Sequence, residues 1–373
     1  MRWLIALAGA VWIVVITWDT FEAIVLPRRV TRRFRTTRMF YRTTWWMWSA
    51  VARRMRASGR RETYLSYYGP LSLLLLFAAW AASLIMAFAM VQIGLGTRLS
   101  VPGGGSFVHH LYMSGETFFT LGLGDVVPLS TIGRVVLVVE AGMGFGFLAL
   151  VIGYVPILYQ AFSRREVEIT LLDARAGSPP SAEELLRAHG ADLDDLVDLL
   201  REWERWCADV LESHLSYPIL SFYRSQHDNQ SWLAALTAEL DTSALVTIGV
   251  EGACQRQAQL TVAMARHTVV DLAQVLGQPP LTSAERLSGD ELARLRASLA
   301  AAGVTLHVGA GADEKLAELR GMYEPYVAAL ARHLIMPLPP WRAGGTSREN
   351  WRTTAWGNIL PPRRDGVDPH EGH

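Results

Sequence analysis

The sequence has little of what secreted or nucleotide-binding proteins usually carry. Its 373 residues include two cysteines, Cys207 and Cys254, too few for a disulfide framework. Both lie in the second half of the chain, which we therefore expect to reside in a reducing compartment. The chain also lacks a Walker-type glycine-rich loop, a Gly-x-Gly-x-x-Gly motif after a strand, and any nucleic-acid-binding module. These absences argue against a nucleotide-binding domain and against nucleic-acid partners.

Charge is balanced overall but unevenly distributed. The formal net charge is +0, with 50% hydrophobic and 19% charged residues. Arginines are concentrated between Arg28 and Arg61, whereas acidic residues are concentrated in the second half. The length allows a membrane part and one soluble domain.

Three apolar stretches are long enough to cross a bilayer: residues 3–26, 70–93 and 129–162. Asp19 and Glu22 interrupt the first near one end and share a face by their i,i+3 spacing. A cleaved signal peptide is the alternative for this stretch. However, no small-x-small cleavage site follows it, and an arginine-rich segment does. We therefore expect a retained first helix.

The basic segment after the first apolar stretch indicates the topology. The positive-inside rule places residues 28–68 in the cytoplasm, the N-terminus outside and the C-terminal domain inside. Interleaved aromatic residues favour an amphipathic helix on an anionic inner leaflet, in contact with lipid between Arg28 and Arg61. A basic loop that only fixes topology is the alternative. A voltage sensor is disfavoured, because the residues between Arg32 and Arg38 are polar.

The chain is organised around residues 117–128, Thr-Phe-Phe-Thr-Leu-Gly-Leu-Gly-Asp-Val-Val-Pro, between the second and third apolar stretches. Non-helical backbone at membrane depth is tolerated only inside protein or along a watery path. Two glycines allow conformations that aim successive carbonyls in the same direction. Four such loops around an axis would form rings of oxygens that replace the water shell of K⁺. An ordinary glycine-rich turn is the alternative.

This stretch resembles the pore loop of the potassium channel family, whose filters mostly read Thr-Val-Gly-Tyr-Gly-Asp. Glu116 falls where a bacterial member of the family also has a glutamate, and Gly133-Arg134 opens the next helix as in that member. Gly144 falls at the usual hinge position, so the resemblance covers roughly residues 70–163. It implies an all-α, homotetrameric channel of the bacterial inner membrane that conducts K⁺ passively. The resemblance implies K⁺ ions in the filter, no other cofactor and no catalytic residue.

The resemblance also assigns roles within the filter. Thr120 would offer a hydroxyl and a carbonyl to the innermost ion site. The outer sites and the mouth would be framed by the carbonyls of Leu121, Gly122, Leu123 and Gly124. Leu123 replaces the family's tyrosine, and Met113 occupies the position of that tyrosine's aromatic partner, so we expect an apolar Leu–Met contact. A poorly selective monovalent cation channel therefore stays open as an alternative.

Three carboxyl groups stand out in the pore region. We expect Glu116 and Asp125 to meet behind the filter and share a proton, with Glu116 as the donor. The alternative is a glutamate satisfied by water. Glu140 lies in the middle of the third apolar stretch, where an ionisable residue indicates either a protonated structural hydrogen bond or a role in gating.

The third apolar stretch contains several residues that weaken a helix. We expect Gly142, Gly144, Gly146 and Pro156 to delimit a movable lower half, with close helix packing as the competing interpretation of the glycines. The resemblance places a further set toward the cavity and the gate, namely Phe145, Leu148, Ile152, Pro156 and Gln160.

Beyond the third apolar stretch, periodic patterns predict an all-helical cytosolic domain. We divide the chain into residues 1–27, 28–68, 69–163, 164–336 and a disordered tail, 337–373. The predicted cytosolic helices cover residues 182–188, 193–211, 232–240, 244–276 and 314–334.

A dense set of polar residues lies in these otherwise apolar helices. Such a set could form a binding site for a metal or a small cytosolic ligand, or the substrate site of a membrane-anchored enzyme. His-x-x-x-His spacing is absent, and satisfied core polar groups are the favoured interpretation. The set comprises Glu212, Ser213, His214, Tyr217, Arg224, His227, Asp228, Asn229, Asp241, Glu251, Arg256, His267 and Asp271.

Overall fold

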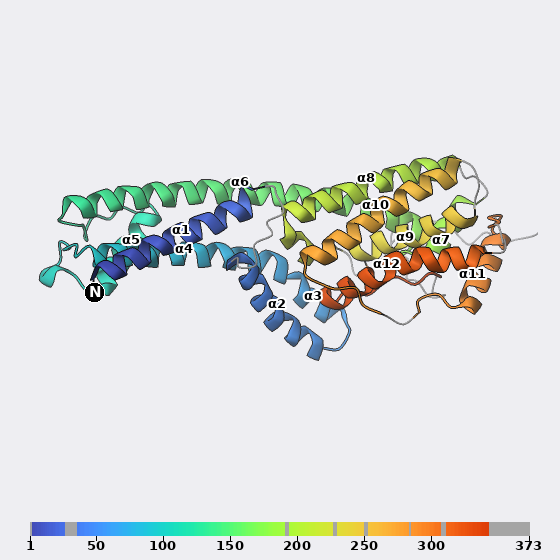
Figure 1. Cartoon of the computed structure of the whole chain (residues 1–373), viewed down its shortest axis with the longest axis horizontal. Helices are drawn as coiled ribbons and strands as arrows, with labels where there is room; N and C mark the ends of the chain where they lie inside the picture. Colours follow the sequence, from blue (N-terminus) through green and yellow to red (C-terminus); the bar gives the residue numbers. More distant parts are fainter. Residues whose placement is uncertain are drawn as a thin grey trace, which may run out of the picture. The chain divides into compact units, whose positions relative to one another are not determined.

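The computed structural model describes residues 2–26, 36–190, 194–226, 230–249, 253–282, 285–306 and 311–342. Over these residues the chain is helical, apart from turns, loops and one isolated antiparallel bridge between Leu99 and Pro128 (Figure 1). The chain divides into two compact units. The first comprises Met1–Arg164 with Glu212–Arg224, and the second comprises Arg165–Leu211 with Ser225–His373. The prediction of an all-α protein is confirmed.

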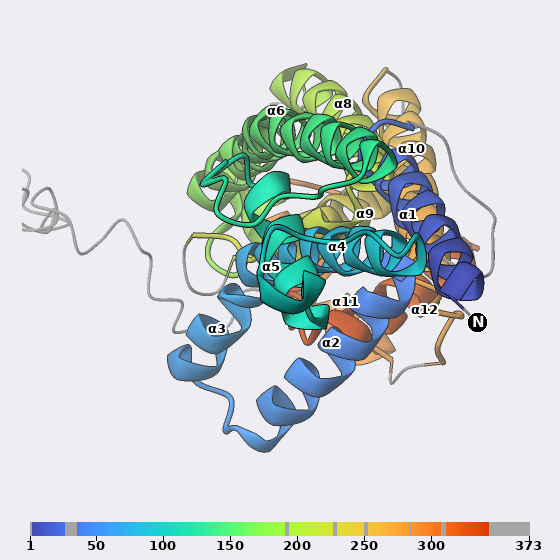
Figure 2. The ribbon, with the colours of Figure 1, turned by 90° about the vertical axis from the view of Figure 1, so that its left-hand side faces the viewer.

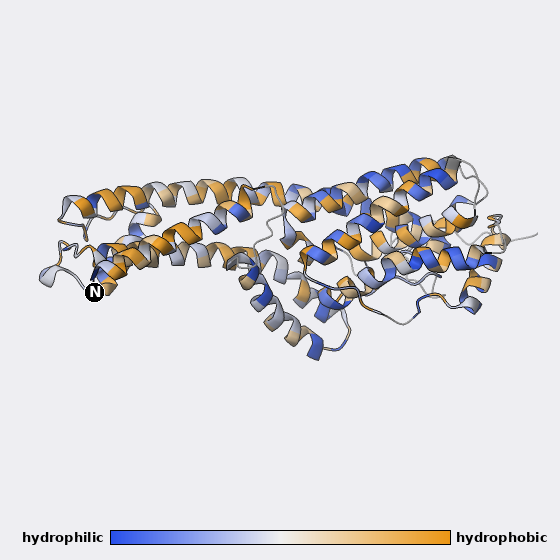
Figure 3. Cartoon of the chain, in the orientation of Figure 1, coloured by the Kyte–Doolittle hydropathy of each residue, from blue (hydrophilic) through white to orange (hydrophobic). Residues whose placement is uncertain are grey.

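The described residues contain three helices that are long and apolar enough to cross a membrane. They are α1 (Arg2–Ile24), the continuous stretch of α3 and α4 (Gly59–Ser66 and Tyr68–Gly94), and α6 (Thr131–Ala176). Apolar residues dominate α1, α4 and the first part of α6 (Figure 3). The chain is a membrane protein with the predicted three spans, although α6 continues past the predicted end at residue 162.

Helices α1 and α4 lie side by side along their length (Figures 1 and 2). Small residues allow the two backbones to approach closely. A Cβ on Gly9 would lie 2.7 Å from the Ala87 carbonyl oxygen, and one on Gly94 would lie 2.3 Å from the backbone nitrogen of Ala6. The first span is therefore packed against α4 through two close glycine contacts, which lie near the start of α1 and the end of α4.

Asp19 fastens the first span to α2 (Thr36–Arg54). Its buried carboxylate accepts hydrogen bonds from the Thr37 backbone N–H (3.1 Å), the Thr37 hydroxyl (2.6 Å) and the Trp80 indole N–H (3.2 Å). Because the first N–H groups of a helix have no partner within it, the carboxylate acts as a cap supplied from another helix. Helix α2 lies at the opposite end of α4 from α5 (Phe107–Phe118) (Figure 1). Residues 27–35, with five of the arginines, lie outside the described residues.

The second unit is a bundle around α9 (Trp232–Gly249), which is buried on almost every side. The sequence pattern missed α11, although Ser288 and Glu291 form a capping box at its start. It also predicted a break between residues 240 and 244, where α9 is continuous, and one helix over 244–276, whereas α9 ends at Gly249 and α10 begins at Ala253. The other helices are α7 (Ala182–His189), α8 (Asp194–Ser216), α10 (Ala253–Val275), α11 (Gly289–Ala301) and α12 (Ala312–Leu334).

The predicted tail begins within the packed bundle. Met336 and Trp341 are 3% and 2% exposed, and the Trp341 carbonyl accepts a hydrogen bond from the Glu183 backbone N–H (3.2 Å). Trp341 therefore holds the first described residues of the predicted tail against the bundle, in a proline-rich segment to which the pattern gave no weight. The rest of the predicted tail, from residue 343, lies outside the described residues.

Candidate functional site

Helix α5 supports the candidate filter from behind. It begins at Ser106, which forms a capping box with His109, and it contacts α4 on one side and α6 on the other (Figure 2). The chain leaves α5 through two hydrogen bonds to its last carbonyls, from the Phe119 N–H to Gly115 (3.1 Å) and from the Leu121 N–H to Glu116 (2.8 Å). The start of the filter is thus bound to the end of the helix.

The filter backbone alternates between two conformations. Thr120, Gly122 and Gly124 have φ values of 55°, 63° and 74°, whereas the two leucines between them are absent from the positive-φ residues. Alternation of this kind turns successive carbonyls toward the same side of the chain. Glycine adopts positive φ without strain, but threonine rarely does. The alternating φ values are those that a ladder of carbonyls on one side of the chain would need.

The outer end of the filter is pinned to the loop that follows α4. The Leu129 N–H donates to the Arg98 carbonyl (2.9 Å), and the Ser100 N–H donates to the Val127 carbonyl (3.0 Å). The Ser100 hydroxyl oxygen in turn accepts from the Val127 N–H (2.9 Å). These bonds hold the chain just after the filter, so both ends of the candidate ladder are anchored.

The predicted contact between Leu123 and Met113 is not formed within the single chain. Met113 is fully buried and packs against Leu99 and Val126, whereas 66% of Leu123 is exposed. Leu121 is exposed to the same extent. Met113 therefore belongs to an apolar cluster under the outer loop.

Asp125 has a different partner from the predicted one. The Tyr112 hydroxyl on α5 donates to the Asp125 carboxylate at 3.2 and 3.3 Å. Glu116 and Asp125 are close enough to interact electrostatically, and the backbone N–H of Leu123 also acts on the Glu116 carboxyl group. Within the described residues no hydrogen bond joins the two carboxyl groups, so the expected Glu116 donation to Asp125 is not formed. Tyr112 lies next to Met113 on α5, the residue that we predicted to lie beside the filter, so the sequence offered a signal for the actual pair.

Glu140 lies inside the module rather than on the cavity side. Its side chain is 0% exposed, and its carboxyl group contacts the Ser114 hydroxyl of α5. Nothing in the sequence alone identified Ser114 as its partner, because the pairing depends on how α5 packs on α6.

The three inner-helix glycines have different surroundings. A Cβ on Gly144 would lie 1.9 Å from the Phe118 carbonyl oxygen, whereas one on Gly142 or Gly146 would meet nothing within 4 Å in the single chain. Helix α6 runs unbroken through all three and through Pro156. At Gly144 the geometry supports the packing interpretation, because α5 touches the helix there. The predicted cavity residues are all exposed on α6: Phe145, Leu148, Ile152, Pro156 and Gln160.

The polar set of the soluble region does not converge on one site. Asp241 is bound by Arg286 (2.7 Å) and by the Tyr323 hydroxyl (2.7 Å), and burial raises the pKa of its carboxyl group. Elsewhere His267 pairs with Asp271 (3.4 Å). Other members lie in the first unit, where Tyr217 stacks edge-on against Tyr154 and Arg224 pairs with Glu62 (3.4 Å). His227, Asp228, Asn229 and Glu251 lie outside the described residues.

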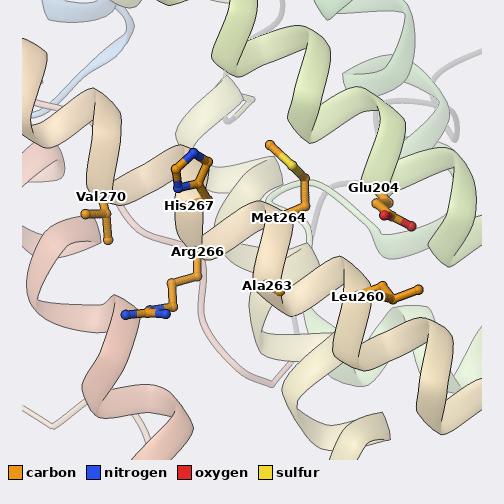
Figure 4. Close-up of a pocket in the computed structure, with 7 residues that line it drawn as sticks. All are labelled: Glu204, Leu260, Ala263, Met264, Arg266, His267 and Val270. Carbon is orange, nitrogen blue, oxygen red and sulfur yellow. The ribbon is translucent and has the colours of Figure 1, made fainter.

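One open groove of roughly 520 Å³ lies on α10, with Glu204 of α8 at its edge (Figure 4). Its lining side chains point away from one another rather than toward a common centre (Figure 4). Among the described residues, no group of three or more His, Cys, Asp and Glu side chains is arranged to hold a metal ion. The groove is lined by Glu204, Leu260, Ala263, Met264, Arg266, His267 and Val270.

Two spanning helices, a short helix between them and an anchored loop of alternating backbone conformation define a pore module. Residues 73–161 match a protein family described as "Ion channel", and this part of the chain is an ion-channel pore module. The chain is also 23% identical over 230 residues to "Uncharacterized membrane protein YdjJ" of Bacillus subtilis strain 168. That match covers 60% of this chain and 65% of the relative's own length. No solved structure matches the chain.

Proposed function

We propose that four copies of this chain form a potassium-selective channel. The observation that carries the proposal is the alternating backbone of Thr120, Gly122 and Gly124, which turns carbonyls of the filter to one side. Rings of such carbonyls from four chains replace the hydration shell of K⁺. One loop supplies a quarter of each ring, so the homotetramer follows from the ion chemistry.

The exposed surface of the pore module supports assembly. Phe119, Leu121 and Leu123 are 59%, 66% and 66% exposed in the single chain. An exposed row of apolar side chains of this kind marks a surface that binds another protein. Neighbouring copies of the chain would cover it. The exposed residues Phe145, Leu148 and Ile152 of α6 would line the cavity below, and Gly142, Gly146 and Pro156 would permit the lower part to move.

The arginine distribution supports an orientation with the filter at the outer face of a bacterial inner membrane. In the first unit α2 and α5 lie at opposite ends of α4 (Figure 1). The basic α2 would then lie on the cytoplasmic side, near anionic lipid, and the soluble bundle would follow α6 into the cytoplasm. We propose that a cytosolic ligand of that bundle, protons or anionic lipid gates the channel.

A flux assay tests the proposal. The full chain is reconstituted in vesicles, and reversal potentials are measured in mixed K⁺ and Na⁺. We expect values close to the K⁺ equilibrium potential. Equal permeability to the two ions would instead favour a poorly selective cation channel. Leu123 gives that alternative its support, because the exposed leucine forms no polar brace behind the filter.

A matched pair of variants connects the flux to the filter. Gly122→Ala places a side chain at φ 63°, where an L-residue is strained, and should abolish flux. Gly103→Ala changes a glycine at φ 78° in the outer loop, with no atom within 4 Å of the new Cβ. It carries a similar local strain away from the ladder and should conduct like the wild type.

A further inference from the structure

Three helices of the pore module meet at one hydroxyl group. Ser114 on α5 lies with its Oγ 2.8 Å from the carbonyl oxygen of Ile85 on α4 and in hydrogen-bond contact with Oε1 of Glu140 on α6. Ser114 and Glu140 are both 0% exposed. The contact lies behind the filter, two turns before Thr120.

The Ser114 hydroxyl has two oxygen neighbours and only one hydrogen to donate, and this indicates the protonation state of Glu140. A serine hydroxyl has one hydrogen to donate, and a backbone carbonyl accepts only. If that hydrogen goes to Ile85, the Ser114 oxygen must accept from its other neighbour, and Glu140 must carry the proton. An ionised Glu140 would leave two acceptors sharing one hydrogen and would bury an unpaired charge.

No charged group is placed to compensate an ionised Glu140. Helix α4 has no charged residue between Tyr68 and Gly94. Helix α5 has no lysine or arginine, and its titratable residues are His109, His110, Tyr112 and Glu116. His110 contacts the Ser106 and Thr97 carbonyls, and Glu116 is itself acidic. Within the described residues, Glu140 takes part in no ion pair, and its second oxygen has no hydrogen-bond partner.

A second contact lies one turn further along both helices. Ser114 and Phe118 are four residues apart on α5, and Glu140 and Gly144 are four residues apart on α6, so each pair lies on one helix face. Gly144 has no Cβ, which lets α6 touch the Phe118 carbonyl directly. The contact between α5 and α6 therefore ends at Phe118, two residues before Thr120. The Ser114–Glu140 hydrogen bond lies at one end of this contact, and the close approach of Gly144 to the Phe118 carbonyl lies at the other.

We propose that Glu140 is a protonated carboxylic acid that positions the pore helix, and through it the filter, by donating a hydrogen bond to Ser114. The Ser114 hydroxyl donates its own hydrogen bond to the Ile85 carbonyl, so two consecutive hydrogen bonds connect α6, α5 and α4. Glu140 is a positioning residue and does not touch the ion. Its role in selectivity depends on the potassium-channel function proposed above, whereas its protonation does not.

Infrared spectroscopy tests the proton directly. Spectra of the reconstituted full-length wild type and of Glu140→Gln are compared at neutral pH. We expect the wild type to show a carboxylic acid C=O stretch that the variant lacks and that remains unchanged as the outer pH is raised by one unit. If the difference spectrum shows a carboxylate band and no carboxylic acid band, Glu140 is ionised and the proposal is wrong.

Permeability measurements test the positioning role. Glutamine keeps a neutral donor, so Glu140→Gln should retain the wild-type ratio of K⁺ to Na⁺ permeability. Glu140→Leu and Ser114→Ala each remove the hydrogen bond and should lower the ratio. If the whole contribution of one hydrogen bond acts on the filter equilibrium, the decrease is on the order of fivefold. The double variant should lower it no further, because both changes break one contact.

Ser72→Ala is the matched control. Ser72 is a buried serine on α4 whose hydroxyl donates to the Gly69 carbonyl of its own helix (3.0 Å). It should leave the ratio unchanged. If Ser114→Ala forms tetramers and keeps the wild-type ratio, the positioning role is wrong. If the wild type itself does not distinguish K⁺ from Na⁺, the positioning role fails with the proposed function, and the infrared band still decides the proton.

Discussion

At the scale of single residues, the filter depends on backbone conformations that its side chains do not favour. Thr120 has φ 55°, one of two non-glycine residues with positive φ in the described part of the chain. Such a conformation costs roughly 1–2 kcal/mol. It persists because the flanking backbone is bound to α5 and to the loop after α4. The two filter glycines could be predicted from the sequence, but the conformation of Thr120 could not, because threonine shows no such preference.

Gly144 gives a direct test of the seam between α5 and α6. Gly144→Ala would place a methyl group 1.9 Å from the Phe118 carbonyl oxygen. Two backbones would have to separate, so we expect destabilisation of about 1–3 kcal/mol, typical of overpacking. The measurement is the thermal unfolding of the purified protein in detergent. Gly142→Ala meets no atom within 4 Å in the single chain and should be neutral or stabilising. Equal effects of the two changes would contradict the packing role.

Glu239 is a buried acid in the soluble unit that the sequence pattern did not single out. It is 1% exposed on α9, and the residues on either side of it, Ala238 and Leu240, are apolar. The Cys207 thiol donates to it at 3.3 Å. Burial raises the pKa of the Glu239 carboxyl group well above its usual value. An acid in a helix that is buried all round was a usable signal, since a charge in such a place requires a partner or a proton.

The raised pKa makes the stability of the soluble unit depend on pH. The folded-state pKa of Glu239 lies above the unfolded value of about 4.3. Its contribution is therefore fully present below the unfolded pKa and is lost as pH rises through the folded pKa. Glu239→Gln should remove this loss, so the variant should gain thermal stability over the wild type as pH increases. Glu318→Gln, an exposed change on α12, should show no such trend. A constant difference between Glu239→Gln and wild type at all pH values would refute the mechanism.

At the scale of secondary-structure elements, hydrophobic length was the most reliable signal. The predicted spans 3–26 and 70–93 agree with α1 and α4 to within about two residues. The ends of α6, the separation of α9 from α10 and the existence of α11 could not be read in the same way. In these elements tertiary packing decides where a helix stops, and the local pattern carries little information about packing.

The cap of α2 is an element-scale feature that rests on one carboxylate. Asp19→Ala would remove the acceptor for the Thr37 N–H and hydroxyl and for the Trp80 indole. Loss of a cap costs about 1 kcal/mol, and each buried donor left unsatisfied adds about 1–3 kcal/mol. We expect faster hydrogen exchange in the first turn of α2. Thr20→Ala is the control, because the buried Thr20 hydroxyl donates within α1 to Ile16. Unchanged exchange in Asp19→Ala would show that α2 forms without this cap.

At the scale of the whole molecule, a single chain leaves the pore module incomplete. The most apolar window of α6 is only 11% buried, and the filter leucines are exposed. Lipid would cover some of this surface and other copies the rest. The order of spans and loop could be predicted from the sequence, because each is encoded locally. The surfaces between copies could not, because a symmetric interface shows no periodicity that distinguishes it from a face in contact with lipid.

Shared ion sites predict a stabilisation specific to K⁺. If four chains supply the carbonyl rings, K⁺ binds the assembled state and not the separated chains, so it raises the free energy of dissociation. At 100 times the dissociation constant one site contributes about 2.7 kcal/mol. We expect the temperature at which tetramers dissociate to be higher in K⁺ than in Na⁺ at equal ionic strength. Gly122→Ala, which disturbs the ladder, should abolish the difference, whereas Gly103→Ala should keep it. If Na⁺ stabilises the wild-type assembly as strongly as K⁺ does, the ladder does not select by coordination, and the poorly selective channel becomes the better interpretation.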